Sequence, residues 1–218
     1  MEQEPKRTYL VEDMDPGSSY KLGTGLTVPR PIGWIGTVDA DGNHNLAPYS
    51  FFNMMAIYPP TFVVAPVLGG RKDTLSNLET TREFTVNIVT EETVEQMNAT
   101  AATLDAGVSE FEATGLTPMA SETVAAPMVG EATANFECVV TQIIPVGKPS
   151  GDLPGTGMLV IGEATRIHVA ERVVDDHFNV DQVELKAIGR HVGGMYTTTA
   201  NSLFTIDRPP ERLPTQAT

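Results

Sequence analysis

The clearest hydrophobic pattern in the chain is a pair of apolar segments on either side of a polar turn. In the first segment, residues 30–38, three large apolar side chains share one parity, which predicts a strand: Ile32, Trp34 and Val38. Residues 39–43 have the Asp, Asn and Gly content of a hairpin loop. Residues 44–52 predict a second strand, although Pro48 has no backbone N–H to give to a central strand. The pattern fits either a plain amphipathic hairpin with a bulge, or a sheet edge whose backbone groups face a flat ligand.

Other segments predict further strands and a few helices. Period-two alternation or continuous apolar runs predict strands over residues 61–67, 83–89, 131–146 and 158–169. Helical spacing predicts helices from Asp73 or Thr74 to about 81, from Thr90 to about 104, and briefly from Ser109 to Gly115. Residues 20–28 are expected to form a first strand or an approach segment, residues 54–60 a connector, and residues 117–130 irregular structure. Without a repeat or a strand–helix rhythm, these elements predict a mainly β, antiparallel fold rather than a doubly wound sheet.

The length of 218 residues fits one β-rich domain with additions. Residues 1–19 are polar and contain Pro and Gly, so we expect an N-terminal arm there. The domain itself is expected over residues 20–206, and residues 207–218 are expected to form a flexible C-terminal tail.

Composition narrows the classes of partner. The chain has 28 acidic and 14 basic residues and a formal net charge of −14, which argues against nucleic acids and anionic membranes as partners. It has no apolar run of about 18 residues and no apolar segment after its charged first residues, so neither a membrane span nor a secretory signal is expected. The single cysteine, Cys138, lies in a strand-like run and is expected in the core. These features favour the cytoplasm.

A possible anion site lies where the helix near residue 73 begins. Arg71 and Lys72 precede Asp73 and Thr74 there. A helix N-terminus offers free N–H groups and a partial positive charge, and two cations and a hydroxyl add donors for a phosphate. From the residues alone, a capped surface helix with two solvated cations fits as well.

Three motifs in order give the chain a family resemblance. They are RPIGWIGTVDADGNHNLAPYSFFN (30–53), PPTFVVAP (59–66) and RKDTLSNLETTREFTVNIV (71–89). In this combination the sequence resembles the flavin-reductase-like family of FMN-binding split β-barrels, over roughly residues 20–200. The resemblance implies an antiparallel Greek-key split β-barrel with a few peripheral helices. It also implies a homodimer with FMN in a groove at the subunit interface.

The resemblance assigns roles to residues of this sequence. The phosphate of FMN is expected at Arg71, Lys72, Asp73 and Thr74. The isoalloxazine ring is expected against Thr37, Ala47, Pro48, Tyr49, Ser50, Phe51 and Asn53, and beside Arg190 and Tyr196. Arg30 fits either a contact to the ribityl chain or phosphate, or a salt bridge at the end of a strand. His191 fits either a nicotinamide contact or proton acceptor, or a loop histidine in water; no metal site is expected.

These residues lead to a functional hypothesis with alternatives. The first is a flavin reductase that transfers a hydride from the nicotinamide of NADH or NADPH to flavin N5, with the flavin carrying the chemistry. The second is a flavoredoxin-like FMN electron-transfer protein, reduced by a protein partner and lacking its own NAD(P)H site. A third is an oxidoreductase that acts on its own organic substrate with bound FMN. An oxygenase or an electron-transfer protein is a possible partner in the first two cases.

Overall fold

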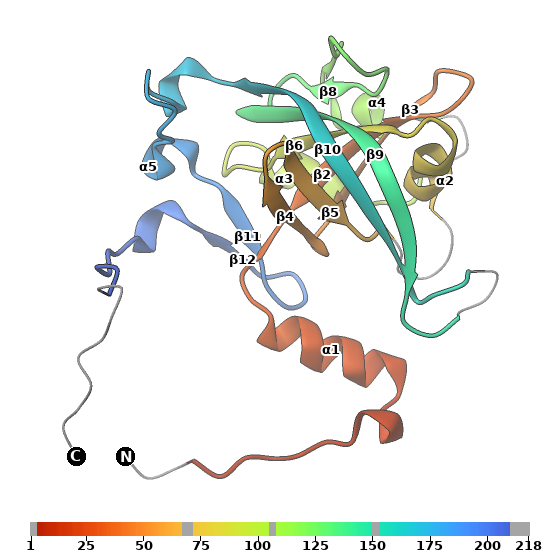
Figure 1. Ribbon diagram of the computed structural model, residues 1–218, viewed down its shortest axis with the longest axis vertical. Helices are drawn as coiled ribbons and strands as arrows, with labels where there is room; N and C mark the ends of the chain where they lie inside the picture. Colours follow the sequence, from red (N-terminus) through yellow and green to blue (C-terminus); the bar gives the residue numbers. More distant parts are fainter. Residues whose placement is uncertain (1–3, 67–71, 105–107, 150–152, 210–218) are drawn as a thin grey trace.

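The computed structural model describes residues 4–66, 72–104, 108–149 and 153–209, and its centre is a large sheet (Figure 1). The strands of this sheet are β2 (Gly33–Val38), β3 (His44–Tyr49), β4 (Phe52–Ile57), β5 (Pro60–Val64), β6 (Glu83–Ile88), β9 (Ala134–Val146) and β10 (Gly157–Val169). Within the described ranges, these seven strands pair antiparallel in the order β3-β2-β6-β9-β10-β5-β4. The order leaves β3 and β4 as the two edges. The predicted mainly β, antiparallel fold is confirmed.

Smaller elements surround this sheet. Short strands form a three-stranded sheet of β1 (Arg30–Pro31), β11 (Ile188–Arg190) and β12 (Tyr196–Thr198), and a pair of β7 (Pro118–Met119) and β8 (Met128–Val129). The helices are α1 (Pro16–Leu26), α2 (Asp73–Thr80), α3 (Val94–Ala99), α4 (Glu110–Thr114) and α5 (Gln182–Leu185), with 3₁₀ turns at Val11–Asp13, Glu171–Val173 and Ala200–Ser202. Figure 1 shows α1 set apart from the large sheet, next to the loop between β11 and β12. Within the described residues, no helix combines the length and apolarity needed to cross a membrane.

Strand β2 is buried on both faces, which divides the interior in two. Ile35 belongs to the cluster that contains Leu75 and Leu78 of α2. Trp34 points to the opposite face and joins the cluster that contains Met97 of α3. The Trp34 indole Nε1 donates a hydrogen bond to the Thr100 hydroxyl at 2.9 Å, so its polar atom is satisfied inside the core.

The predicted hairpin is confirmed, with Ile35 opposite Ala47 and Trp34 opposite Pro48. Strand β3 lies at the edge of the sheet, where a proline is tolerated because no further strand needs its N–H group. Cys138 is buried in β9, as predicted for a core cysteine, and burial raises the pKa of its thiol.

The expected strand over residues 20–28 is wrong, because helix α1 runs from Pro16 to Leu26. Its start is a strong local signal: the Asp15 carboxylate accepts a hydrogen bond from the Ser18 N–H at 3.0 Å, and Pro16 occupies the first turn. The expected boundary between the arm and the domain, at residue 19, falls inside this helix.

Three further expectations need correction. Residues 54–60 are not a connector, because β4 runs to Ile57 and pairs with β5 from Pro60, which as the first residue of its strand needs no ladder hydrogen bond. The helix expected from Thr90 is only α3, since Thr90 itself bridges to Ala187. Residues 117–130, expected to be irregular, contain the pair β7 and β8.

Candidate functional site

A cavity of about 590 Å³ lies where β3 ends, between α1, α3 and the β11–β12 hairpin. We call it the Arg30 cavity. It brings together seven residues that the sequence predicted for the site: Arg30, Pro48, Tyr49, Ser50, Arg190, His191 and Tyr196. Its volume lies in the range of small-molecule sites, about 300–1,000 Å³.

Arg30 holds the walls of this cavity together. Its side chain is only 6% exposed and donates four hydrogen bonds. The acceptors are the carbonyl oxygens of Thr24 (2.6 Å), Thr27 (2.9 Å) and His191 (3.0 Å), and the hydroxyl of Ser50 (3.2 Å). Arg30 therefore joins the end of α1, the end of β3 and the segment after β11, and the predicted alternative of a strand-end salt bridge does not match these neutral partners.

The opposite wall is built on the β11–β12 hairpin. Arg190 and Tyr196 are cross-strand neighbours, and the guanidinium carbon lies 4.5 Å from the centre of the tyrosine ring. Arg190 also donates a hydrogen bond to the carbonyl of Gly193. The Tyr196 hydroxyl donates to the side-chain oxygen of Asn98 in α3 at 3.0 Å. These contacts set a stacked cation and aromatic ring at the cavity wall.

The charge of this cavity is opposite to that of the chain. Lys21, Arg30 and Arg190 line it, and its described lining contains no Asp or Glu. In a chain with 28 acidic and 14 basic residues, such a lining is selective for an anionic ligand. Apolar surface for a ring comes from Ile32 and Met97.

A second cavity of about 580 Å³ lies beside the first and shares Tyr20, Thr24, Arg30 and Ser50 with it. Two further predicted residues, Phe51 and Asn53, line this second cavity and not the first. The rings of Tyr20 and Phe51 meet edge to face, with their centres 6.5 Å apart. The segment from Pro48 to Asn53 therefore divides between two adjoining cavities, with Ser50 on the border.

Thr37 and Thr74 belong to a polar network on the face of the hairpin that meets α2. The side-chain amide of Asn45 donates to both hydroxyls at 2.9 Å. Thr37 also accepts from Asn77 (3.1 Å), and Thr74 accepts from the Tyr49 hydroxyl (2.8 Å). Burial raises the pKa of Tyr49 to about 12, so this hydroxyl stays protonated and donates. Thr37 and Ala47 line none of the cavities described here, whereas Tyr49 connects the Arg30 cavity to the start of α2.

Helix α2 begins without a side-chain cap. Its first helical residue is Asp73, as predicted, and its N-cap residue is the exposed Lys72. Because the Lys72 side chain accepts no capping bond, and within the described residues no other cap is seen, the first N–H groups are open to another acceptor, as a phosphate site requires. Arg71 lies outside the described residues.

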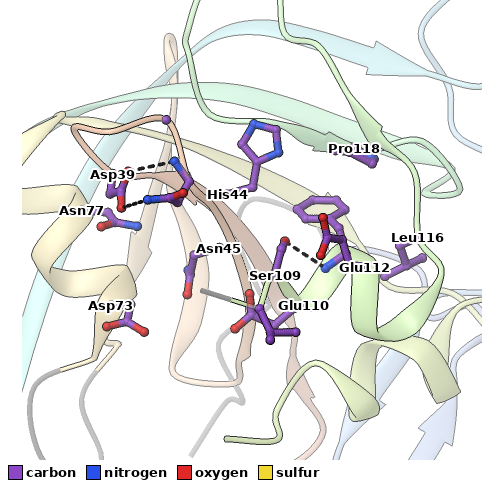
Figure 2. Close-up of a pocket in the computed structure, with 14 residues that line it drawn as sticks. Asp39, His44, Asn45, Asp73, Asn77, Ser109, Glu110, Glu112, Leu116 and Pro118 are labelled. Carbon is purple, nitrogen blue, oxygen red and sulfur yellow. Dashed lines mark hydrogen bonds between the residues drawn. The ribbon is translucent and has the colours of Figure 1, made fainter. Parts of the chain in front are cut away.

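Asp73 faces a third cavity, of about 470 Å³, shown in Figure 2. Four carboxylates line it together with His44, from the β2–β3 turn and the starts of α2 and α4: Asp39, Asp73, Glu110 and Glu112. The described lining has no Lys or Arg, so this cavity repels the anion that the Arg30 cavity favours. Glu110 also accepts a hydrogen bond from the Leu46 N–H at 3.0 Å, on the free edge of β3.

The sequence reasoning missed the contributions of α1 and α3 to the Arg30 cavity. Lys21 was placed in an expected strand, so its position on a helix facing the cavity had no signal. Met97 and Asn98 lie within the helix predicted from Thr90, but nothing in the sequence assigned either residue to the site. The bond between Asn98 and Tyr196 joins segments 98 residues apart in the chain.

Comparison with known proteins defines the class. The model of the flavin reductase like domain matches residues 25–185. The chain therefore belongs to this family of flavin-dependent oxidoreductases, and its fold is the split β-barrel. An uncharacterized protein of Aquifex aeolicus is 39% identical over 197 residues, covering 88% of this chain and 95% of the relative.

Solved structures agree with this assignment. Nitrilotriacetate monooxygenase component B from Bacillus cereus has a TM-score of 0.87 at 34% identity, covering 94% of this chain and all of that one. The 2-nitrobenzoate 2-nitroreductase NbaA of Pseudomonas fluorescens has a TM-score of 0.84 at 29% identity, covering 97% and 100%. A putative flavin reductase with a split barrel domain from Shewanella frigidimarina shares the fold, with a TM-score of 0.78 at 24% identity and coverage of 91% and 96%.

The residues present fit FMN. An anionic ligand suits the cationic lining of the Arg30 cavity, and a planar ring suits its apolar and aromatic surfaces. The uncapped start of α2 suits a phosphate, and Tyr49 connects the two regions.

Proposed function

We propose that this chain is an FMN-binding, NAD(P)H-dependent flavin reductase. The observation that carries the proposal is the Arg30 cavity, where five of the predicted ring-binding residues meet in a lining of three cations and no described carboxylate. The likeness to component B of a monooxygenase, at 34% identity over 94% of the chain, supports a reductase that serves an oxygenase.

In this proposal the chain binds and orients the reactants. FMN, when bound, supplies the chemistry by accepting a hydride at N5. The backbone of Pro48, Tyr49 and Ser50 and the Ser50 hydroxyl hold the polar edge of the ring, and Ile32 and Met97 exclude water from its surface. The N–H groups at the start of α2, with Lys72, hold the phosphate.

The nicotinamide of NADH or NADPH, which is the second reactant, is placed against the β11–β12 hairpin. The Arg190 guanidinium stacks on the Tyr196 ring and forms a flat surface there, and His191 is half-buried in the same wall. We assign His191 to the nicotinamide amide, with NADH and NADPH both open as donors. The adjoining cavity, which shares Arg30 and Ser50, gives space for two ring systems to meet.

We also propose a homodimer with FMN near the subunit interface, in the cytoplasm. Its support is the exposed apolar edge around β4, where Ile57 is 86% exposed and Tyr58 is 96% exposed. Edge strands of this kind need a cover, and a second copy supplies one. The single, reduced Cys138 suits the cytoplasm. Light scattering at micromolar concentration tests the dimer; a monomer mass with FMN bound refutes it.

A second candidate is a reductase that acts on its own organic substrate. The structural likeness to a 2-nitrobenzoate nitroreductase, at 29% identity over 97% of the chain, favours it. The cationic lining of the Arg30 cavity also suits an aromatic carboxylate. The flavoredoxin-like carrier remains the alternative without a nicotinamide site.

One set of measurements separates these functions. The purified protein is titrated with FMN, and oxidation of NADH and NADPH is followed with free FMN, with 2-nitrobenzoate, or with neither. Turnover with FMN supports the flavin reductase, and turnover only with 2-nitrobenzoate supports the second candidate. A bound flavin that is bleached by dithionite but by neither nicotinamide refutes both and favours the carrier.

A further inference from the structure

Arg30 is a buried positive charge that has no acidic partner in the part of the chain that the structure describes. All four of its hydrogen-bond acceptors are uncharged: the carbonyl oxygens of Thr24, Thr27 and His191 and the hydroxyl of Ser50. Among the residues that the structure describes, no carboxylate forms an ion pair with it. The buried Glu137, in contrast, pairs with His168 at 2.7 Å.

This arrangement has an electrostatic consequence. Hydrogen bonds from neutral groups orient a guanidinium, but they leave its charge in place, and a buried charge without a partner is costly. Charges also act more strongly in a poorly solvated region than in water. Because Lys21 and Arg190 line the same cavity, nothing in its described lining offsets this potential. The site is therefore suited to a ligand that becomes more negative during its reaction.

We infer that Arg30 is the fixed positive charge that makes this site hold reduced FMN more tightly than oxidised FMN. The inference rests on the proposed function, in which Ser50 contacts the polar edge of the ring. A hydride brings two electrons and one proton from the nicotinamide, which leaves as oxidised NAD(P)⁺. The neutral ring thereby gains one negative charge, spread over N1 and the C2 oxygen. If Ser50 contacts that edge, Arg30, bonded to Ser50 at 3.2 Å, would lie beside it and would favour this charge without a second proton.

Two variants separate charge from structure. Arg30→Met removes the charge and keeps an unbranched side chain, whereas Arg30→Lys keeps the charge and loses the forked donors. Arg166→Met is the control, because Arg166 is an exposed cation of β10 paired with Glu122 at 2.9 Å. The dissociation constants of oxidised and reduced FMN are measured anaerobically for each protein.

We expect Arg30→Met to lower the preference for reduced FMN by about tenfold or more, which is about 30 mV for a two-electron couple. Arg30→Lys should retain most of the preference, and Arg166→Met should retain all of it. Equal preference in wild type and Arg30→Met overturns the inference. So does an equal loss in Arg30→Met and Arg30→Lys, because that result assigns Arg30 a role in structure alone.

The wild-type protein provides a test that needs no variant. Reduced FMN bound to it should keep the absorption spectrum of the form deprotonated at N1, at a pH where free reduced FMN has taken up this proton. Protonation at the same pH as free reduced FMN overturns the inference even if Arg30→Met does not fold. If the wild type binds both redox forms equally, only this inference fails. If it binds neither form, the proposed function fails with it.

Discussion

Glu137 should be a main source of the acid sensitivity of this fold. It lies in β9, is 0% exposed, and its carboxylate accepts hydrogen bonds from the Thr123 hydroxyl and N–H (2.5 Å each), the Glu122 N–H (2.9 Å) and the His168 ring (2.7 Å). These bonds hold the 120–127 loop against the sheet. Replacing the carboxylate in Glu137→Gln leaves the shape nearly unchanged but removes the charge.

The size of the effect follows from the pKa. Burial alone would raise the pKa of Glu137, but the hydrogen bonds outweigh it and lower the pKa from 4.5 to about 2. A difference of roughly 2.5 units corresponds to about 3 kcal/mol, at about 1.4 kcal/mol per unit. Because the pKa of the folded state is depressed, this stability is fully present above about pH 4.5 and is lost as the pH falls toward 2. Glu137→Gln should therefore cost about 2–3 kcal/mol at pH 7 and progressively less in acid.

Urea unfolding at several pH values between 3 and 7 measures this dependence. The matched control is Glu122→Gln, whose side chain is exposed and pairs with Arg166 on the surface, and it should change stability by no more than about 1 kcal/mol. If Glu137→Gln is as stable as the control at pH 7, or if it loses stability in acid as steeply as wild type, the reasoning is refuted.

Three further predictions concern packing and the proposed phosphate site. Gly36→Ala should destabilise the protein by at least about 2 kcal/mol, because its Cβ would collide with the Pro127 carbonyl and the Thr85 hydroxyl; an unchanged melting temperature contradicts this. Tyr49→Phe should cost about 1 kcal/mol in urea unfolding, since it removes the hydrogen bond to Thr74, and Tyr9→Phe on the exposed arm should cost nothing measurable. Lys72→Glu should weaken FMN binding about tenfold or more and leave riboflavin binding unchanged, because riboflavin lacks the phosphate. An equal loss for both ligands in a flavin titration would place the phosphate elsewhere.

Local pattern was sufficient for much of this fold. Period-two alternation located the strands around Trp34 and Phe84, and helical spacing located α2. It failed where a capping signal or a tight turn outweighed composition, as at Asp15 before α1 and at Tyr58 between β4 and β5. Such boundaries depend on single hydrogen bonds and turn geometry, which hydrophobic periodicity does not encode.

For the candidate site, too, the sequence predicted one part and not another. The motif order identified the family, and the resemblance named seven residues of the Arg30 cavity. The sequence did not show that Thr37 faces Asn45 and Thr74 of α2 rather than the Arg30 cavity, because adjacent side chains of a strand point in opposite directions and the choice of face depends on what packs there.

By itself, the sequence determined where most strand segments lie, the hairpin and the chemical types of the site residues, since these depend on neighbours within a few positions. Only the tertiary structure decided that Arg30 meets His191, 161 positions away, and that Lys21 joins them without a described carboxylate in the cavity lining. Contacts between segments so far apart arise from packing and burial, and the charge of a cavity is a property of the residues that packing brings together.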